Sequence, residues 1–195
     1  MALESTLNIY VMEGYECTTK SSTIKKYFDG RDDMTYRPDY EGLNLDNYIP
    51  RNSRSLLGFE VLKFLKTNPV FFDYNRLAID RGLISGLVYY EMYPLNGNSI
   101  EPIAAKLFEL YKELHVKIVY HYHDDIEVAK KIFNNSLSRE DGGDIYDDTE
   151  FAHYWIKYQT ADKHFRAIME KYELDVIPVP TSKVVANEDL SYLFN

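Results

Sequence analysis

Apolar runs along this chain alternate with segments whose apolar residues recur at helical spacing. Runs rich in β-branched and aromatic residues predict buried strands at 7–13, 34–37, 70–72 together with 77–80, 116–120 and 174–179. Apolar positions three and four residues apart predict helices at 20–28, 53–66, 85–92, 101–113, 124–133 and 149–172. This alternation is typical of a three-layer α/β fold, in which helices cover both faces of a parallel sheet.

Length and composition fit one domain over residues 1–195. The chain is 45% hydrophobic, which is enough for a core of its own. A net charge of −9 argues against a surface built for duplex nucleic acid, which needs clustered Lys and Arg. The single cysteine, Cys17, excludes an intrachain disulfide and fits a reducing compartment. The chain opens without a signal peptide and has no apolar stretch of membrane-spanning length, so we expect a cytoplasmic protein with no membrane partner.

A candidate phosphate-binding loop follows the first predicted strand. A glycine ends the strand, and Lys20 and Ser21 open the next helix, as in the pattern G-x-x-x-x-G-K-[ST]. Thr19 stands where this pattern has its second glycine. The loop residues that would bind the nucleotide are Gly14, Tyr15, Glu16, Cys17, Thr18, Thr19, Lys20, Ser21 and Ser22.

Such a loop has a defined chemistry. Its backbone N–H groups surround the β-phosphate of a nucleotide, and the helix N-terminus adds positive potential. Lys20 would reach the β- and γ-phosphates, Ser21 would bind Mg²⁺, and Ser22 would donate to the α-phosphate. On the usual loop path, a β-branched Thr19 is strained by roughly 1–3 kcal/mol. The pattern leaves open ATP binding with adjusted geometry, weak binding, a decayed relic, or an ordinary helix start capped by Ser21 or Thr19.

A second polar motif ends the strand at 77–80. Asp80 and Arg81 close the strand, Ser85 follows four residues later, and Tyr89 four residues after that. Asp80 alone would suit a helix N-cap. An arginine beside it at a strand end favours a polar site, because ligands of open α/β sheets bind at the carboxyl ends of the strands.

Both motifs resemble those of thymidylate kinases and deoxynucleoside kinases. The second is similar to their D-R-x-x-x-S-x-x-x-Y segment. The loop is similar to their E-G-x-D-x-x-G-K-S-T, with Glu16 at the acidic position, and 36–38 resembles the short strand and Arg-Pro pair that follow. The resemblance covers roughly 7–180 and implies a P-loop NTPase-type fold with a five-stranded parallel sheet in the order 2-3-1-4-5.

The resemblance also implies an activity: transfer of the γ-phosphoryl group of ATP, with Mg²⁺, to a nucleoside, a nucleotide or a modified (deoxy)nucleotide. The implied catalytic residues are Lys20, Asp80, Arg81 and Arg139, and the implied metal ligands are Ser21 and Asp80. Arg139 belongs to a short lid expected at about 135–149, where this family is rich in arginine and this chain carries several acids.

The acceptor is expected beside the segments that follow the second and third strands. Its implied contacts are Arg37, Asp39, Arg54, Phe59, Arg81 and Tyr89. Glu13 or Asp39 is the candidate base for a hydroxyl acceptor.

Two alternatives keep the fold and change the function. In the first alternative, the acceptor would be a hydroxymethylated base in DNA, as in some viral relatives of this family, which would place the protein in a host cytoplasm. Alternatively the chain is a non-catalytic nucleotide- or partner-binding protein, an idea motivated by Thr19 and the acidic lid. A homodimer remains open in every case.

His121, His123, Asp124 and Asp125 form a further polar cluster. Alternation places the two histidines on one face of a strand end. Zinc prefers three or four convergent ligands, so a strand-to-helix junction explains this cluster better than a metal site.

Overall fold

The fold is built on a five-stranded sheet. The computed structural model describes residues 7–30, 33–36, 60, 62–64, 66–68, 74–92, 101–140 and 147–194. The strands are β1 (Asn8–Glu13), β2 (Asp33–Tyr36), β3 (Arg76–Asp80), β4 (Lys117–Tyr122) and β5 (Val176–Pro180). Neighbouring strands pair in parallel, in the order β2-β3-β1-β4-β5, which confirms the expected topology.

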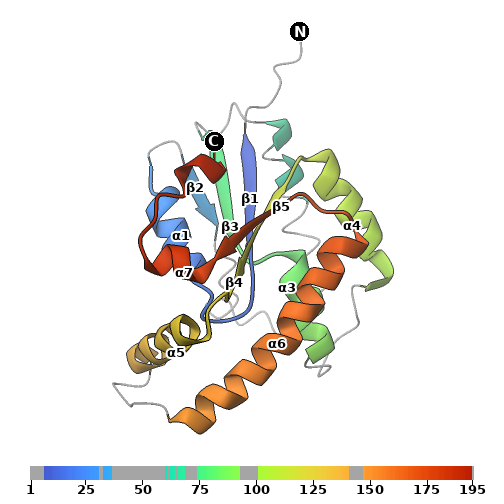
Figure 1. Cartoon of the computed structure of the whole chain (residues 1–195). Coiled ribbons are helices and arrows are strands. Elements are labelled where there is room, and N and C mark those ends of the chain that lie inside the picture. Colours follow the sequence, from blue (N-terminus) through green and yellow to red (C-terminus); the bar gives the residue numbers. More distant parts are fainter. Residues whose placement is uncertain are drawn as a thin grey trace.

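Helices cover both faces of this sheet, as the sequence predicts. They are α1 (Lys20–Tyr27), α3 (Leu83–Met92), α4 (Glu101–Glu113), α5 (Ile126–Glu140), α6 (Asp148–Lys171), α7 (Thr181–Val185) and the 3-10 helix η3 (Ser191–Phe194). Figure 1 shows α3, α4 and α6 on one side of the strands and α1 and α7 on the other. The result is a three-layer architecture.

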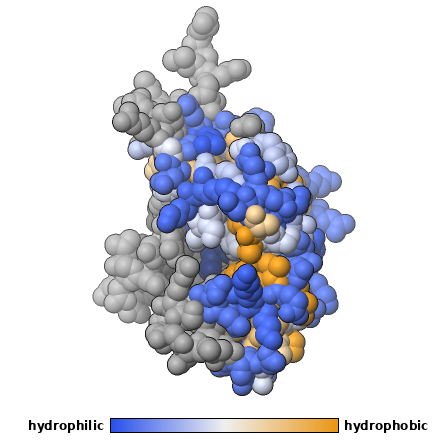
Figure 2. Space-filling model, turned by 60° about the vertical axis from the view of Figure 1, so that its left-hand side comes forward, coloured by the Kyte–Doolittle hydropathy of each residue, from blue (hydrophilic) through white to orange (hydrophobic). Residues whose placement is uncertain are grey.

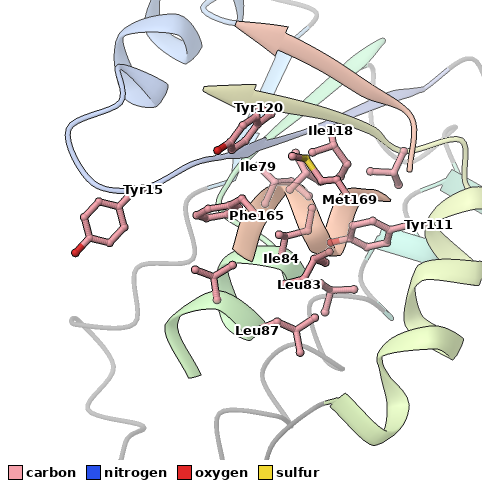
Figure 3. Packing of buried hydrophobic residues seen from close by; sticks show 14 of the residues in the cluster. Tyr15, Ile79, Leu83, Ile84, Leu87, Tyr111, Ile118, Tyr120, Phe165 and Met169 are labelled. Carbon is pink, nitrogen blue, oxygen red and sulfur yellow. The ribbon is translucent and has the colours of Figure 1, made fainter. Parts of the chain in front are cut away.

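Alternate residues of the central strand feed two separate cores. Ile9 and Val11 of β1 belong to the larger cluster, and Tyr10 and Met12 belong to the smaller one on the opposite face. This division follows from the two-residue period of a strand. In the larger cluster the sheet residues meet side chains of α3 and α6 (Figure 3).

The smaller core joins α1 to the C-terminal residues. The ring of Phe194 lies 5.2 Å from that of Phe28 and 5.8 Å from that of Tyr10. The hydroxyl of Tyr27 donates to the carbonyl of Glu188 at 3.0 Å. The sequence patterns predict no element after the last strand, because α7 and η3 are too short to show a period.

Element boundaries differ most at the expected lid. Helix α5 continues to Glu140 instead of ending at 133, and a capping box at Asp147 starts α6. Of the expected lid, 141–146 lies outside the described residues. The helix predicted at 53–66 also lies mostly outside them, although residues 60, 62–64 and 66 are helical.

One face of the molecule is mostly polar: Figure 2 shows it as largely hydrophilic, with hydrophobic areas from its middle toward the lower right edge. Among the described helices, none is long and apolar enough to cross a membrane.

Candidate phosphate-binding site

The β1–α1 connection begins with a glycine that no other residue could replace without strain. Gly14 has φ +134°, in the region that side chains rarely adopt, and a Cβ atom there would lie 2.4 Å from the carbonyl oxygen of His121. Because that oxygen is backbone, it cannot move aside cheaply. Gly14 therefore lets the loop pass close to the end of β4.

The loop then takes the left-handed conformation at two residues with side chains. Cys17 has φ 58°, and Thr19 has φ 64° and ψ 12° as the N-cap of α1. Thr19 therefore occupies the glycine position of the pattern in a conformation that glycine adopts freely. Its hydroxyl lies 3.5 Å from Nδ1 of His121, a fully buried side chain. Burial and the charge of Lys20 lower the pKa of His121 to about 3, so this ring is neutral.

Lys20 lies inside the loop. Its Nζ donates to the carbonyl of Tyr15 at 2.6 Å, to the carbonyl of Gly14 at 2.9 Å and to the hydroxyl of Thr18 at 3.2 Å. Burial and the nearby charge of Arg81 lower the pKa of Lys20 to about 8, which still leaves it charged at pH 7. All three N–H donors of the ammonium are thus taken by uncharged oxygens of the loop, so an anion that binds Lys20 directly would have to replace at least one of them.

Ser21 and Asp80 meet beside this lysine. The hydroxyl of Ser21 lies 3.4 Å from Oδ2 of Asp80, although 59 residues separate them in the chain. They meet because β3 pairs with β1, with Asp80 opposite Met12. A hydroxyl and a carboxylate are hard oxygen donors, and Mg²⁺ commonly takes one or two protein ligands together with phosphate oxygens and water. The pair therefore fits a nucleotide-bound Mg²⁺.

Glu13 holds the turn after β3, a role that the sequence did not reveal. Its Oε1 accepts from the amides of Gly82 at 3.0 Å and Ile84 at 3.2 Å. Its Oε2 accepts from the amide of Ser85 at 3.2 Å and from the Ser85 hydroxyl. Burial raises the pKa of this carboxyl to about 7. With both oxygens occupied and the side chain fully buried, Glu13 clamps the start of α3, and the base role expected for it finds no support.

Arg81 leaves the strand in a left-handed conformation. Its φ is 70°, and its amide donates to the carbonyl of Met12 at 2.9 Å. The guanidinium lies 5.6 Å from the ring centroid of Tyr89, which stacks on Tyr15 at 5.8 Å and 18°. Tyr15 is a buried member of the larger core, and Figure 3 shows it at the margin of the residues drawn. Arg81 is thus presented at the same sheet edge as Lys20, on an aromatic support.

A cavity of about 290 Å³ opens beside the Ser21–Asp80 pair. It lies between α1 and the ends of β2 and β3. Its lining residues are Ser21, Ile24, Lys25, Phe28, Asp29, Thr35 and Asp80. This volume lies near the lower limit of small-molecule sites.

The structure thus brings Lys20, Ser21, Asp80 and Arg81 to one edge of the sheet. Several expected site residues cannot be placed. Arg37, Asp39, Arg54 and Phe59 lie outside the described residues, and Arg139 falls in a stretch of α5 where only the backbone is described.

The histidines at the end of β4 lie in the strand and just after it. His121 is the fifth residue of β4, and His123 follows the strand. Within the described part of the chain, no three His, Cys, Asp or Glu side chains are grouped as a metal site would require. His123 instead contacts Tyr154 of α6 at 2.8 Å, and Tyr154 contacts the carbonyl of Glu16 at 2.8 Å. No local sequence signal points to these contacts, because 138 residues separate Tyr154 from Glu16.

Comparison with known proteins supports the fold. Neither protein-family models nor curated proteins give a match to this chain. Among solved structures, the chain is similar to the YorR protein from Bacillus subtilis in complex with phosphorylated GDP, with a TM-score of 0.59 and 20% identity over 96% of this chain and 95% of that one. A deoxyadenosine kinase from M. mycoides is 12% identical over 91% of this chain and 93% of that one, with a TM-score of 0.46, which is too low to support the fold assignment. The likeness to YorR and the observed strand order together support a three-layer α/β fold around a five-stranded parallel sheet.

Proposed function

We propose that this protein binds ATP with Mg²⁺ at residues 14–22 and transfers the γ-phosphoryl group to a nucleoside or nucleotide. One observation carries the proposal: the Lys20 ammonium is held by uncharged oxygens of a loop that starts at Gly14 and opens α1. A positive charge enclosed in this way, at a helix N-terminus, is suited to a polyphosphate.

The surrounding residues take distinct roles in this proposal. Lys20 stabilises charge on the transferring group, and Arg81 adds a second positive charge from the end of β3. Ser21 and Asp80 would hold Mg²⁺, which supplies charge neutralisation at the phosphates when bound. Phosphoryl transfer leaves little covalent work for the protein, so positioning and charge are what these residues provide. Arg139 would add charge from the expected lid.

The acceptor is the open part of the proposal. Arg37, Asp39, Arg54 and Phe59, with Arg81 and Tyr89, remain the candidates that would contact it. YorR was solved with phosphorylated GDP, so guanosine nucleotides belong in a substrate panel beside deoxynucleosides and monophosphates. DNA carrying a hydroxymethylated base tests the polymer alternative.

The deciding experiment measures ATP consumption against this panel for the wild type and two lysine variants. Lys20→Ala removes the ammonium from the loop and should reduce turnover by at least 100-fold, because one charge-stabilising group is worth about 3 kcal/mol in a transition state. Lys106→Ala on α4 removes an exposed lysine and should leave turnover unchanged. Turnover that survives Lys20→Ala contradicts the mechanism.

Calorimetry with ATP·Mg²⁺ separates catalysis from binding. Binding without turnover on any acceptor favours the non-catalytic alternative. If no ATP binds at millimolar concentration, the loop no longer has the capacity to bind this nucleotide.

A further inference from the structure

Tyr154 supports the phosphate loop from the long helix α6. It lies one to two turns after the helix start, and its side chain is buried. Its ring centroid is 5.9 Å from that of Tyr15, and its hydroxyl donates to the carbonyl of Glu16 at 2.8 Å. Two consecutive loop residues therefore rest on one side chain, by ring packing and by a hydrogen bond.

His123 continues this contact toward α7. Its Nε2 lies 2.8 Å from the Tyr154 hydroxyl, and its Nδ1 lies 3.0 Å from the hydroxyl of Thr181, the first residue of α7. Burial, assisted by the charge of Lys20, lowers the pKa of His123 to about 4, so the ring is neutral near pH 7. A neutral imidazole carries one N–H donor and one acceptor nitrogen.

The single proton of the Tyr154 hydroxyl fixes the donor and acceptor roles in the whole series of hydrogen bonds from Thr181 to Glu16. This proton is given to the carbonyl of Glu16, so the Tyr154 oxygen must accept from Nε2–H of His123. Nδ1 of His123 is then the acceptor, and the Thr181 hydroxyl donates to it. The hydrogen bonds thus run one way, from Thr181 through His123 and Tyr154 to the loop.

A second contact ties the same two connections. Asp124, the neighbour of His123, accepts from the amide of Ser182 at 3.0 Å and from the Ser182 hydroxyl. The β4–α5 connection and the start of α7 are therefore joined by two adjacent hydrogen-bonded pairs. Only the Tyr154 branch reaches the phosphate loop.

We propose that Tyr154 is a positioning residue for the phosphate loop, and that His123, held in its Nε2–H tautomer, links this loop to the start of α7. The part of this inference that concerns ATP rests on the proposed function. This series of hydrogen bonds holds the segments that follow β1, β4 and β5 in fixed positions relative to one another before any ligand binds. Such preorganisation lowers the ordering cost of binding.

The first test uses ligand-free protein and needs no activity. Tyr154→Phe keeps the ring and removes the hydroxyl, and Tyr27→Phe at the end of α1 is the matched control. The Tyr27 hydroxyl also donates to a backbone carbonyl, that of Glu188 at 3.0 Å, and it touches no member of the proposed hydrogen-bond relay. We expect amide hydrogen exchange in residues 15–19 to be about fivefold faster in Tyr154→Phe, the factor for a hydrogen bond worth about 1 kcal/mol, and unchanged in the control.

Nitrogen-15 NMR of the His123 side chain supplies a signature that a purely structural role would not move. The wild type should show the Nε2–H tautomer, and Tyr154→Phe should shift the population toward Nδ1–H because the acceptor of that proton is gone. Unchanged loop exchange in Tyr154→Phe, equal acceleration in the control, or an Nδ1–H tautomer in the wild type overturns the proposal.

The second test measures ATP·Mg²⁺ binding and turnover. Tyr154→Phe should raise the Kd by about 3- to 10-fold, with kcat at saturating ATP within about twofold of the wild type, since the loop is ordered once the nucleotide is bound. Unchanged affinity overturns the link to binding. If the wild type binds no nucleotide while loop exchange still separates the two variants, the positioning role is supported and the proposed function alone fails.

Discussion

Replacing Thr19 by glycine tests whether the phosphate loop stores backbone strain. Thr19 has φ 64° and ψ 12°, the left-handed conformation that costs an L-residue roughly 1–2 kcal/mol. Glycine adopts it without this cost but is more flexible in the unfolded chain, which removes roughly 0.5–1 kcal/mol of the gain. The lost contact with Nδ1 of His121, at 3.5 Å, is long for a hydrogen bond and removes little more.

We therefore expect Thr19→Gly to stabilise the protein by roughly 0.5 kcal/mol, a rise in Tm of about 1–2 °C for a chain of this size. Affinity for ATP should change little. The strain is already present in the ligand-free loop, so it is common to the free and bound states and cancels in the binding equilibrium.

Thermal unfolding and calorimetry with ATP·Mg²⁺ check both expectations. Glu173→Gly is the matched control: Glu173 is exposed, has φ 50° just after α6, and lies on no part of the loop. It should raise Tm by a similar amount. A Tm that falls in Thr19→Gly while it rises in Glu173→Gly would refute the strain argument. A gain in affinity of tenfold or more would show that the free loop is not the one that binds.

Three further outcomes follow from buried groups. Glu13 has a pKa of about 7 in the folded protein, above its ordinary 4.5, so its contribution to the free energy of unfolding is lost as pH rises toward 7. Urea unfolding should show that the stability of the wild type relative to Glu13→Gln falls by about 2–3 kcal/mol between pH 5 and 8. A stability difference independent of pH would contradict this. Gly14→Ala should cost about 1–3 kcal/mol and weaken ATP binding, since its Cβ meets the carbonyl of His121; wild-type stability in chemical denaturation would rule out the clash. The guanidinium of Arg76 donates two hydrogen bonds, at 2.7 and 2.6 Å, to the two oxygens of the buried Asp33 carboxylate. Arg76→Ala removes both and should lower the free energy of unfolding by about 2 kcal/mol, measured in the same way. A loss below about 0.5 kcal/mol would show that water replaces the arginine.

Local sequence was sufficient for the five strands and for the longer described helices, although not for the short α7 and η3. Apolar runs identify β1 and β4 because buried parallel strands are apolar on both faces. The loop spacing identifies Lys20 and Ser21, and Asp80 with Arg81 marks the end of another strand. Parallel strands place their carboxyl ends together, so this information also predicts that Ser21 and Asp80 meet, as they do.

Tertiary structure decided which partners each polar group found. Glu13 is a candidate base by sequence, and only the neighbouring position of β3 makes it the clamp for the amides of α3. Tyr154 looks like one of several packing residues on α6, yet its hydroxyl reaches Glu16. Periodicity records which face of an element is buried, because burial acts on each residue separately. Hydrogen-bond partners distant in sequence depend on strand order, register and helix placement, which arise only when the whole chain packs.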